Sequence, residues 1–374
     1  MRSLFLVPAL VLALVATRVC AFPPDDPEEK PFPTVTQIWD FPAPNGPIGV
    51  TGHLEIHAAT DLGSMRKVIE AFQRHAPGLS VRYADSNTRP LYDAIARICA
   101  EGGEQPDVVL SSAVDLQVQL ANDGCTVQHR PVDADTRPDW AIWRNEVFGF
   151  SFEPVVIVYN RRFLLPTELP RSRFELIDLL RREPERFRGR IGTYDIARSG
   201  VGYLLAQEDA RQAGSFGRLI ESFGRAEVRR YCCTADILNA LEEGELLVGY
   251  NLLGSYALLR AAASPDLEIV LPRDYTLVLS RAAILPRNAK NTQAGRAFLD
   301  FMLSREGQAA MAASGTMIPI SPELGGPWTR SWVEEQADGP LRPIPVAPRL
   351  MVGLDSQVQA RFLKEWRAGL DLPR

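Results

Sequence analysis

Apolar and polar residues follow a repeating order in the first half of the chain, in which a strand pattern precedes a helix pattern. Residues 54–58 alternate between apolar and polar, which predicts a strand with one buried face, and residues 79–83 predict a second strand. Residues 107–110 are nearly all apolar, as in a parallel strand covered on both faces. Apolar residues at helical spacing, such as Met65 and Val68, follow each strand. Three successive strand–helix units predict an α/β fold with a parallel sheet.

The second half repeats this alternation and adds two long apolar runs. Its pattern predicts helices over residues 174–180, 202–209, 216–223 and 237–241. It predicts strands over residues 190–194, 228–231, 246–250 and 267–271. The runs at residues 147–160 and 275–285 are too long for one ordinary strand. An extended segment that crosses between two lobes explains each run. Residues 294–311 predict one strongly amphipathic helix, and residues 358–366 predict another amphipathic stretch near the C-terminus.

The N-terminus has the plan of a secretory signal peptide. Arg2 precedes an apolar run at residues 4–16, which is shorter than the roughly 20 residues that span a bilayer. The small residues Val19 and Ala21 predict cleavage after Ala21 and export of the mature chain. Lipid attachment at Cys20 is the alternative. The residues just before it, Arg18 and Val19, fit the recognition of a lipid attachment site poorly.

Composition and charge narrow the class of protein. A chain of 374 residues has room for two domains, or for one large domain with attachments. Hydrophobic residues at 46% and charged residues at 23% are ordinary globular values, which exclude a wholly disordered chain. Loss of Arg2 and Arg18 with the signal peptide takes the formal net charge from -5 to -7. Because a general nucleic-acid binder needs a surplus of Lys and Arg on one face, no nucleic-acid partner is expected.

Cleavage also leaves an even set of four cysteines, which can pair in an oxidising compartment. Cys99 ends one predicted helix and Cys125 follows the end of the next, so we expect a disulfide between them. The adjacent Cys232 and Cys233 could form only a strained bridge, and two small buried residues at a strand end are the favoured interpretation. Four His and no C-x-x-C pair predict neither a metal site nor a cofactor.

Standard catalytic signatures are missing from the sequence. It contains no phosphate-binding P-loop, no H-E-x-x-H, no G-x-S-x-G and no G-x-G-x-x-G. We therefore expect no catalytic residues and no enzymatic activity.

Polar clusters instead recur at the carboxyl ends of predicted strands, just before helices. They are Thr60 with Asp61, Ser111 with Ser112, Arg198 with Ser199 and Gly200, and Asn251 with Ser255. Ligands of open α/β sheets collect at this edge, where free helix N-terminal amides and hydroxyl donors favour an anion. Helix capping explains any single cluster equally well. Four clusters in both halves of the chain favour a ligand-binding cleft between two lobes.

Two charged residues are further candidates for ligand contact. Arg198 precedes a helix start and could form a charge-assisted contact to phosphate or carboxylate, or it could be an exposed loop residue. Glu153, in the first proposed crossing, could accept hydroxyl or ammonium groups of a ligand, or it could be a salt-bridged hinge residue. Arg89 is a weaker candidate, and Tyr250 and Tyr256 either line the cleft or belong to the core.

Several segments resemble the bacterial extracytoplasmic solute-binding proteins of ABC transporters. They are DVVLSSA at residues 107–113, EPVVIVYN at 153–160, GYNLLGSY at 249–256, NTQAGRAFLDFM at 291–302 and SREGQ at 304–308. The likeness covers residues 54–320 and is greatest to the subset that includes ferric-ion, sugar-phosphate and phosphoglycerate binders. Residues 341–366 resemble the phosphoglycerate-uptake regulatory branch, whose members present ligand to a membrane sensor.

The resemblance implies a two-lobed periplasmic-binding-protein fold of type II with two hinge crossings. We expect lobe 1 to comprise residues 53–149 and 276–330, and lobe 2 to comprise residues 150–275. An extended arm at residues 22–52 precedes them, and residues 331–374 form a tail that packs on the lobes. The expected protein is a periplasmic monomer, whose partner is an ABC permease or a membrane sensor kinase.

The sequence departs from the ferric binders of this group in one respect. Those proteins typically use an adjacent pair of tyrosines, and this chain has none. We therefore expect the ligand to be a small organic anion, with a phosphorylated one favoured. A ferric-ion-binding transport protein is the alternative within the same class, and an exported hydrolase acting at the cleft is the alternative from another class.

Overall fold

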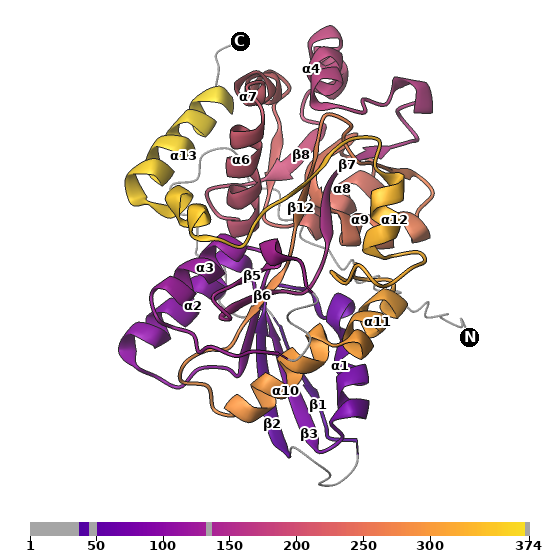
Figure 1. Cartoon of the computed structure of the whole chain (residues 1–374). Helices are drawn as coiled ribbons and strands as arrows, with labels where there is room; N and C mark the ends of the chain where they lie inside the picture. The colour runs from indigo at the N-terminus through magenta and orange to yellow at the C-terminus, as the bar shows by residue number, and fades with distance from the viewer. Residues whose placement is uncertain (1–36, 45–50, 132–136, 371–374) are drawn as a thin grey trace, which may run out of the picture.

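Two seven-stranded sheets organise the chain (Figure 1) in the computed structural model, which describes residues 37–44, 51–131 and 137–370. The first sheet has the strand order β1-β3-β2-β4-β13-β6-β5. Its strands are β1 (Gln37–Phe41), β2 (Gly52–Ala58), β3 (Leu79–Asp85), β4 (Val108–Ser111), β5 (Ile142–Trp143), β6 (Val147–Gly149) and β13 (Ala282–Ile284). The strands β2, β3 and β4 are parallel, as the three strand–helix units predicted.

Helices cover both faces of the first sheet because its central strands are apolar on both sides. They are α1 (Leu62–His75), α2 (Thr88–Glu101), α3 (Val114–Asn122), α10 (Thr292–Leu303) and α11 (Arg305–Ser314). Val108 of β4 packs with α1, α10 and α11, whereas its neighbour Val109 packs with α2 and α3. On the first of these faces, Phe72 and Phe298 meet edge to face with their ring centroids 5.0 Å apart.

The second sheet has the order β14-β12-β7-β10-β8-β9, and β11 pairs with β7. Its strands are β7 (Glu153–Asn160), β8 (Ile191–Tyr194), β9 (Arg229–Tyr231), β10 (Val248–Leu253), β11 (Leu267–Val270), β12 (Thr276–Leu279) and β14 (Leu341–Pro343). Its helices are α4 (Arg173–Arg182), α5 (Pro184–Phe187), α6 (Gly200–Gln212), α7 (Phe216–Arg225), α8 (Thr234–Glu242), α9 (Gly254–Ala263), α12 (Arg330–Gln336) and α13 (Ser356–Leu370). None of the helices in the described residues is long and apolar enough to cross a membrane.

The two long apolar runs connect the sheets, and each divides into two strands. The first run leaves the first sheet at the end of β6 and begins β7 at Glu153, and the second passes from β12 to β13 between Leu279 and Ala282. The segments are hydrogen-bonded to each other, since Phe150 N donates to Arg281 O at 2.9 Å. These passages lie close to the expected lobe boundaries at residues 150 and 275, although the assignment of residues to lobes stays a prediction.

The sequence pattern misjudged two elements. Residues 294–311 form two helices, because Ser304 is extended (ψ 162°) and its Oγ accepts a hydrogen bond from Gly307 N at 3.1 Å, which starts α11. Part of the expected arm, residues 37–41, is the edge strand β1, which pairs with β3 because Trp39 packs near Tyr83 and Asp40 pairs with Arg82. The predicted signal peptide and its cleavage site lie outside the described residues.

The C-terminal segment adds a strand and a helix to the second half of the molecule. β14 pairs in parallel with β12, and α13 lies beside α6 and α7 (Figure 1). Phe216 of α7 stacks on Phe362 of α13 with ring centroids 6.0 Å apart, and Tyr203 donates a hydrogen bond to Gly353 O. The turn at Pro348–Leu354 also lies against α3, so the tail contacts helices of both sheets.

The expected disulfide between Cys99 and Cys125 is confirmed, and it joins the end of α2 to the end of α3. Replacing both cysteines by Ser should lower the free energy of unfolding by about 3 kcal/mol, because the bond closes a loop of 26 residues and restricts the unfolded chain. Urea denaturation of the apo protein measures this loss. The matched control is Cys233→Ser, which removes a thiol that forms no disulfide and should leave stability within about 1 kcal/mol. Equal losses in the two variants would contradict a stabilising role for the bond.

Candidate functional site

A cavity of about 240 Å³ lies between the two sheets, where the starts of six helices meet. Its wall includes one residue or more at the start of each of α1, α2, α3, α6, α8 and α9. These residues include Asp61, Asn87, Ser112, Ser199, Thr234 and Tyr256. The first N–H groups of a helix have no intrahelical partner and carry a partial positive charge. The cavity therefore combines hydroxyl and amide donors with several positive helix ends.

The N-cap side chains at most of these helices do not satisfy the helix ends themselves. Of these six described helices, only α6 has a side-chain cap, in which Ser199 Oγ accepts from Gly202 N at 3.2 Å. Asp61 and Asn87 are residue types that commonly cap, yet neither accepts a hydrogen bond from its own first turn. Capping therefore accounts for Ser199 but leaves Asp61 and Asn87 to be explained by another role.

A fully buried arginine, Arg281, forms part of the cavity wall. Its Nε donates to Glu153 Oε1 at 2.9 Å and its Nη1 donates to Thr60 Oγ1 at 2.8 Å. The guanidinium also lies over the ring of Tyr256, 4.8 Å from the centroid. Burial opposes the charge, but the hydrogen bonds to Tyr256 and Glu153 and the charge of Glu153 outweigh burial and raise the pKa of Arg281, so the side chain is a permanent cation.

Tyr256 connects this arginine to the other side of the cavity. Its hydroxyl accepts a hydrogen bond from Asp61 N at 3.1 Å. Burial raises the pKa of Tyr256 above its usual range, so the phenol is neutral and can also donate. A second contact across the cavity joins the two sets of helices, where Gly200 N donates to Thr88 Oγ1 at 2.9 Å.

The cavity also contains acidic groups. Asp85, at the end of β3, lines the wall near Asp61. Burial, and then the charge of Asp61, raise the pKa of Asp85 to about 7. Asp85 therefore changes between a hydrogen-bond donor and an acceptor near neutral pH.

Four of the ten residues proposed from the sequence line this cavity: Thr60, Asp61, Ser112 and Ser199. Three others lie directly behind its wall. Glu153 pairs with Arg281 and accepts from Ser255 N at 3.2 Å, and Ser255 Oγ accepts from Arg281 Nη2 at 3.4 Å. Ser111 is buried and its Oγ accepts from Ala113 N.

The remaining three lie elsewhere. Arg198 and Gly200 line a separate small pocket together with Arg89 and Asp115. Asn251 adopts a positive φ of 63° at an irregularity in β10, which turns its amide toward Asp209, 2.8 Å away.

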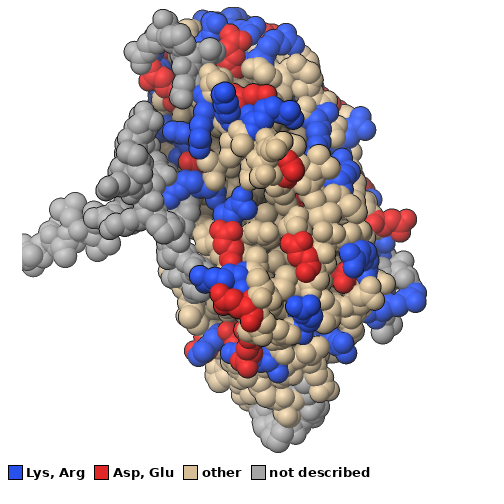
Figure 2. All heavy atoms as spheres, turned by 90° about the vertical axis from the view of Figure 1, so that its left-hand side faces the viewer, with Lys and Arg blue, Asp and Glu red and all other residues tan. Residues whose placement is uncertain are grey.

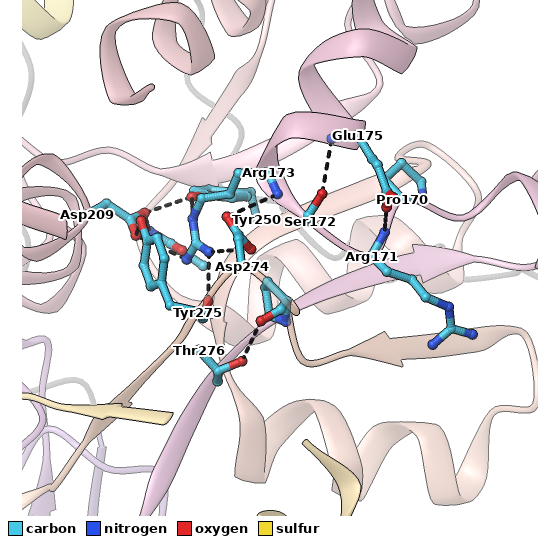
Figure 3. Close-up of polar contacts among 12 residues, drawn as sticks. Pro170, Arg171, Ser172, Arg173, Glu175, Asp209, Tyr250, Asp274, Tyr275 and Thr276 are labelled. Atoms are coloured by element: carbon cyan, nitrogen blue, oxygen red, sulfur yellow. Dashed lines mark hydrogen bonds and ion pairs between the residues drawn. The ribbon is translucent and has the colours of Figure 1, made fainter. Parts of the chain in front are cut away.

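Asn251 belongs to a buried polar network through its hydrogen bond to Asp209. Arg173 and Asp209 form the centre of this network (Figure 3). Asp209 also accepts hydrogen bonds from the hydroxyls of Tyr250 and Tyr275 at 2.7 and 2.8 Å. Arg173 donates to Tyr250, Asp209 and the Tyr275 carbonyl, and its guanidinium lies 3.8 Å from the centroid of the Tyr275 ring. Because these groups satisfy one another, the network joins α4, α6, β10 and the start of β12 and leaves Tyr250 in the core.

Sequence reasoning missed Arg281, Asp85 and the pair Asn87–Thr88 as site residues. The signal for Arg281 was a single charged residue inside an apolar run, which requires a buried partner. Asn87 and Thr88 follow a predicted strand and precede a helix, which is the same pattern that identified Thr60 and Asp61.

Comparison with known proteins defines the class. Residues 57–316 match the family model described as bacterial extracellular solute-binding protein, and the chain belongs to this family. It is 38% identical to the crystal structure of an ABC-transporter substrate-binding protein from Agrobacterium tumefaciens, with a TM-score of 0.85 over 90% of this chain and 99% of that one. No curated protein matches the sequence.

More distant structures share the fold. They include iron-bound HitA from Pseudomonas aeruginosa, at 18% identity and a TM-score of 0.65 over 85% of this chain and 99% of that one. AfuA from Actinobacillus pleuropneumoniae, bound to exogenous fructose-6-phosphate, has 19% identity and a TM-score of 0.67 over 87% of this chain and all of that one. The predicted two-lobed periplasmic-binding-protein fold is confirmed, and the chain is a solute-binding protein of ABC transport, a class that works with membrane permeases.

Asp209→Asn should lower the free energy of unfolding by about 3 kcal/mol, because it leaves the buried Arg173 cation without its main counter-charge. Urea denaturation gives the value. Asp274→Asn is the matched control, since Asp274 pairs with the same guanidinium at 3.3 Å but is partly exposed, and its loss should cost about 1 kcal/mol. The reverse order of the two losses would refute the assignment of Asp209 as the centre of the network.

Asp85→Asn should make the free energy of unfolding less sensitive to rising pH. Because the pKa of Asp85 is raised by folding from the usual value near 4 to about 7, the protonated form favours the folded state. This stability is present at low pH and is lost as the pH rises toward 7. Between pH 5 and pH 8 the variant should gain about 2 kcal/mol relative to the wild type, as measured by urea denaturation at each pH. A constant difference between the two proteins would disprove the shift.

Proposed function

We propose that the protein captures a small organic anion, with a phosphorylated metabolite favoured, in the cavity at the six helix starts. The proposal rests on the helix starts that line the cavity, where most N-cap side chains accept no hydrogen bond from the first turn. At α1, α2 and α8 the N-cap side chain accepts no hydrogen bond from the first-turn amides, and an anion is an acceptor that such amides favour. The first turns of α3 and α9 already donate to the carboxylates of Asp115 and Glu153. Arg281 adds a permanent cation to the same wall.

The acidic side of the cavity supports a ligand that carries hydroxyl groups as well as an anionic group. Asp61 and Asp85 offer carboxylate oxygens, which accept hydrogen bonds from hydroxyls but repel a second anionic group. A phosphorylated polyol or hydroxy acid presents both kinds of group. The volume of about 240 Å³ suits a ligand of a few carbon atoms.

The surroundings of Tyr256 argue against direct binding of ferric ion. The Tyr256 hydroxyl already accepts from Asp61 N and lies 3.5 Å from Arg281 Nη1, so a trivalent ion bound to it would lie beside another cation. Tyr256 is also the only tyrosine in the wall of the described cavity.

The route of the solute follows from the family. We infer delivery to a membrane permease for ABC-type import from the periplasm, after removal of the signal peptide near Ala21, with the protein acting as a monomer. Presentation to a membrane sensor kinase is the alternative route, which the likeness of residues 341–366 to the phosphoglycerate-uptake regulatory branch supports.

A thermal-shift screen of phosphorylated metabolites with three to six carbons tests the ligand class. Binding to the folded state alone should raise the melting temperature by an amount that grows with ligand concentration. Stabilisation by ferric citrate and by none of the phosphorylated compounds would overturn the proposal. Release of inorganic phosphate on prolonged incubation would point to a hydrolase.

Ser112→Ala should weaken binding of the best compound from this screen by about 10-fold, because the ligand loses one hydroxyl partner. Isothermal titration calorimetry measures the dissociation constant. The matched control is the adjacent Ser111→Ala, which removes a hydroxyl that faces Ala113 N and should change affinity by less than about 3-fold. Equal weakening in both variants would show that Ser112 does not contact the ligand.

A further inference from the structure

Two adjacent thiols and a carboxylate form a cluster at the start of α8. The Sγ atoms of Cys232 and Cys233 lie 3.5 Å apart, and Cys232 Sγ lies 2.9 Å from Asp236 Oδ2. The three side chains can bring one ligand atom each within 4.8 Å of the others. Neither cysteine forms a disulfide, and both line the solute cavity.

We propose that Cys232, Cys233 and Asp236 bind one thiophilic divalent cation of the zinc type at the wall of the solute cavity. The spacing fits such an ion. Zinc–sulfur bonds of about 2.3 Å and zinc–oxygen bonds of about 2.0 Å place tetrahedral ligand atoms roughly 3.5 to 4 Å apart. The two sulfur atoms already have this separation, Asp236 Oδ2 lies 2.9 Å from Cys232 Sγ, and all three ligand atoms lie within 4.8 Å of one another.

Cys233 is the N-cap residue of α8 and Asp236 lies in its first turn, so one short segment presents all three ligands. The hydrogen bond with Cys233, burial and the nearby Asp236 carboxylate raise the pKa of Cys232 in the metal-free protein. A bound ion therefore replaces the thiol proton that Cys232 donates to Asp236. Two thiolates and one carboxylate select a borderline-soft ion such as Zn²⁺ over Mg²⁺ or Ca²⁺, which prefer oxygen ligands alone.

The cluster supplies three protein ligands and leaves a fourth position open. Because both cysteines line the cavity, that position faces the space in which the solute binds. Zinc sites with three protein ligands commonly take a water or a substrate oxygen in the fourth position. The bound ion would therefore offer one coordination position to an oxygen atom of the solute. The proposal concerns the metal site alone and does not depend on the identity of the solute.

The oxidation state of the thiols is the first test. The protein is prepared from periplasm under anaerobic conditions without a reductant, and its accessible thiols are titrated after removal of metal with a chelator. Two reactive thiols per chain are expected, in Cys232 and Cys233, with the bond between Cys99 and Cys125 intact by peptide mapping. An absence of reactive thiols would show that the adjacent pair is bridged, and it would overturn the proposal.

Binding is then measured with Co²⁺ as a spectroscopic probe and with Zn²⁺ in competition with a chromophoric chelator. One Co²⁺ per chain should produce thiolate-to-metal charge-transfer absorption in the near ultraviolet, and one equivalent of Zn²⁺ should abolish it. Cys232→Ser and Cys233→Ser should each weaken Zn²⁺ binding by at least about 100-fold, beyond the roughly 10- to 100-fold that loss of an outer-shell partner causes. Asp236→Asn should weaken it by about 10-fold and keep the absorption band.

Glu243→Gln is the matched control, because Glu243 is a carboxylate at the opposite end of α8 and outside the cluster. It should retain the band and the affinity for Zn²⁺. Far-ultraviolet circular dichroism establishes that each variant is folded. The proposal is wrong if the folded wild type with two reactive thiols gives no charge-transfer band, or if both cysteine variants bind Zn²⁺ as tightly as the wild type does.

Discussion

The buried ion pair between Arg281 and Glu153 is the interaction on which the geometry of the molecule depends. Each residue lies in a different one of the two segments that connect the sheets. Both side chains are almost fully buried, so neither charge could remain there without the other. The same guanidinium contacts Thr60 before α1 and Tyr256 in α9. A single cation thus fixes how the two connections lie together and how the two sets of helix starts face each other.

Binding and stability compete at these helix starts. A side-chain cap stabilises a helix by about 0.5 to 2 kcal/mol, and most of the helices around the cavity lack one. The uncapped starts of α1, α2 and α8 reduce the stability of the unliganded protein and are a source of affinity for an anion. The disulfide between α2 and α3 and the Arg173–Asp209 network lie outside the cavity and offset such a cost without occupying the site.

The sequence predicted the order of strands and helices well, because the apolar spacing of each element reports the face that it buries. The pattern also identified Thr60, Asp61, Ser112 and Ser199, which line the cavity, since the carboxyl ends of strands in each sheet face it. It could not place side chains whose direction depends on tertiary contacts. The side chain of Asn251 points to Asp209 because of an irregularity in β10, so it does not line the cavity. Arg281 can be assigned to the cavity only when its buried partner Glu153 is known.

The mild acidity of the chain does not decide what enters the cavity. Figure 2 shows acidic and basic side chains intermingled on a largely uncharged face, so the net charge of -5 does not appear there as a field of one sign. Charges on such a surface are screened over about 8 to 10 Å in physiological salt. The dipole of a helix end acts within its first turn, and a buried guanidinium is screened much less than an exposed one. The potential that a solute meets in the cavity therefore comes from the helix starts, Arg281 and the nearby carboxylates.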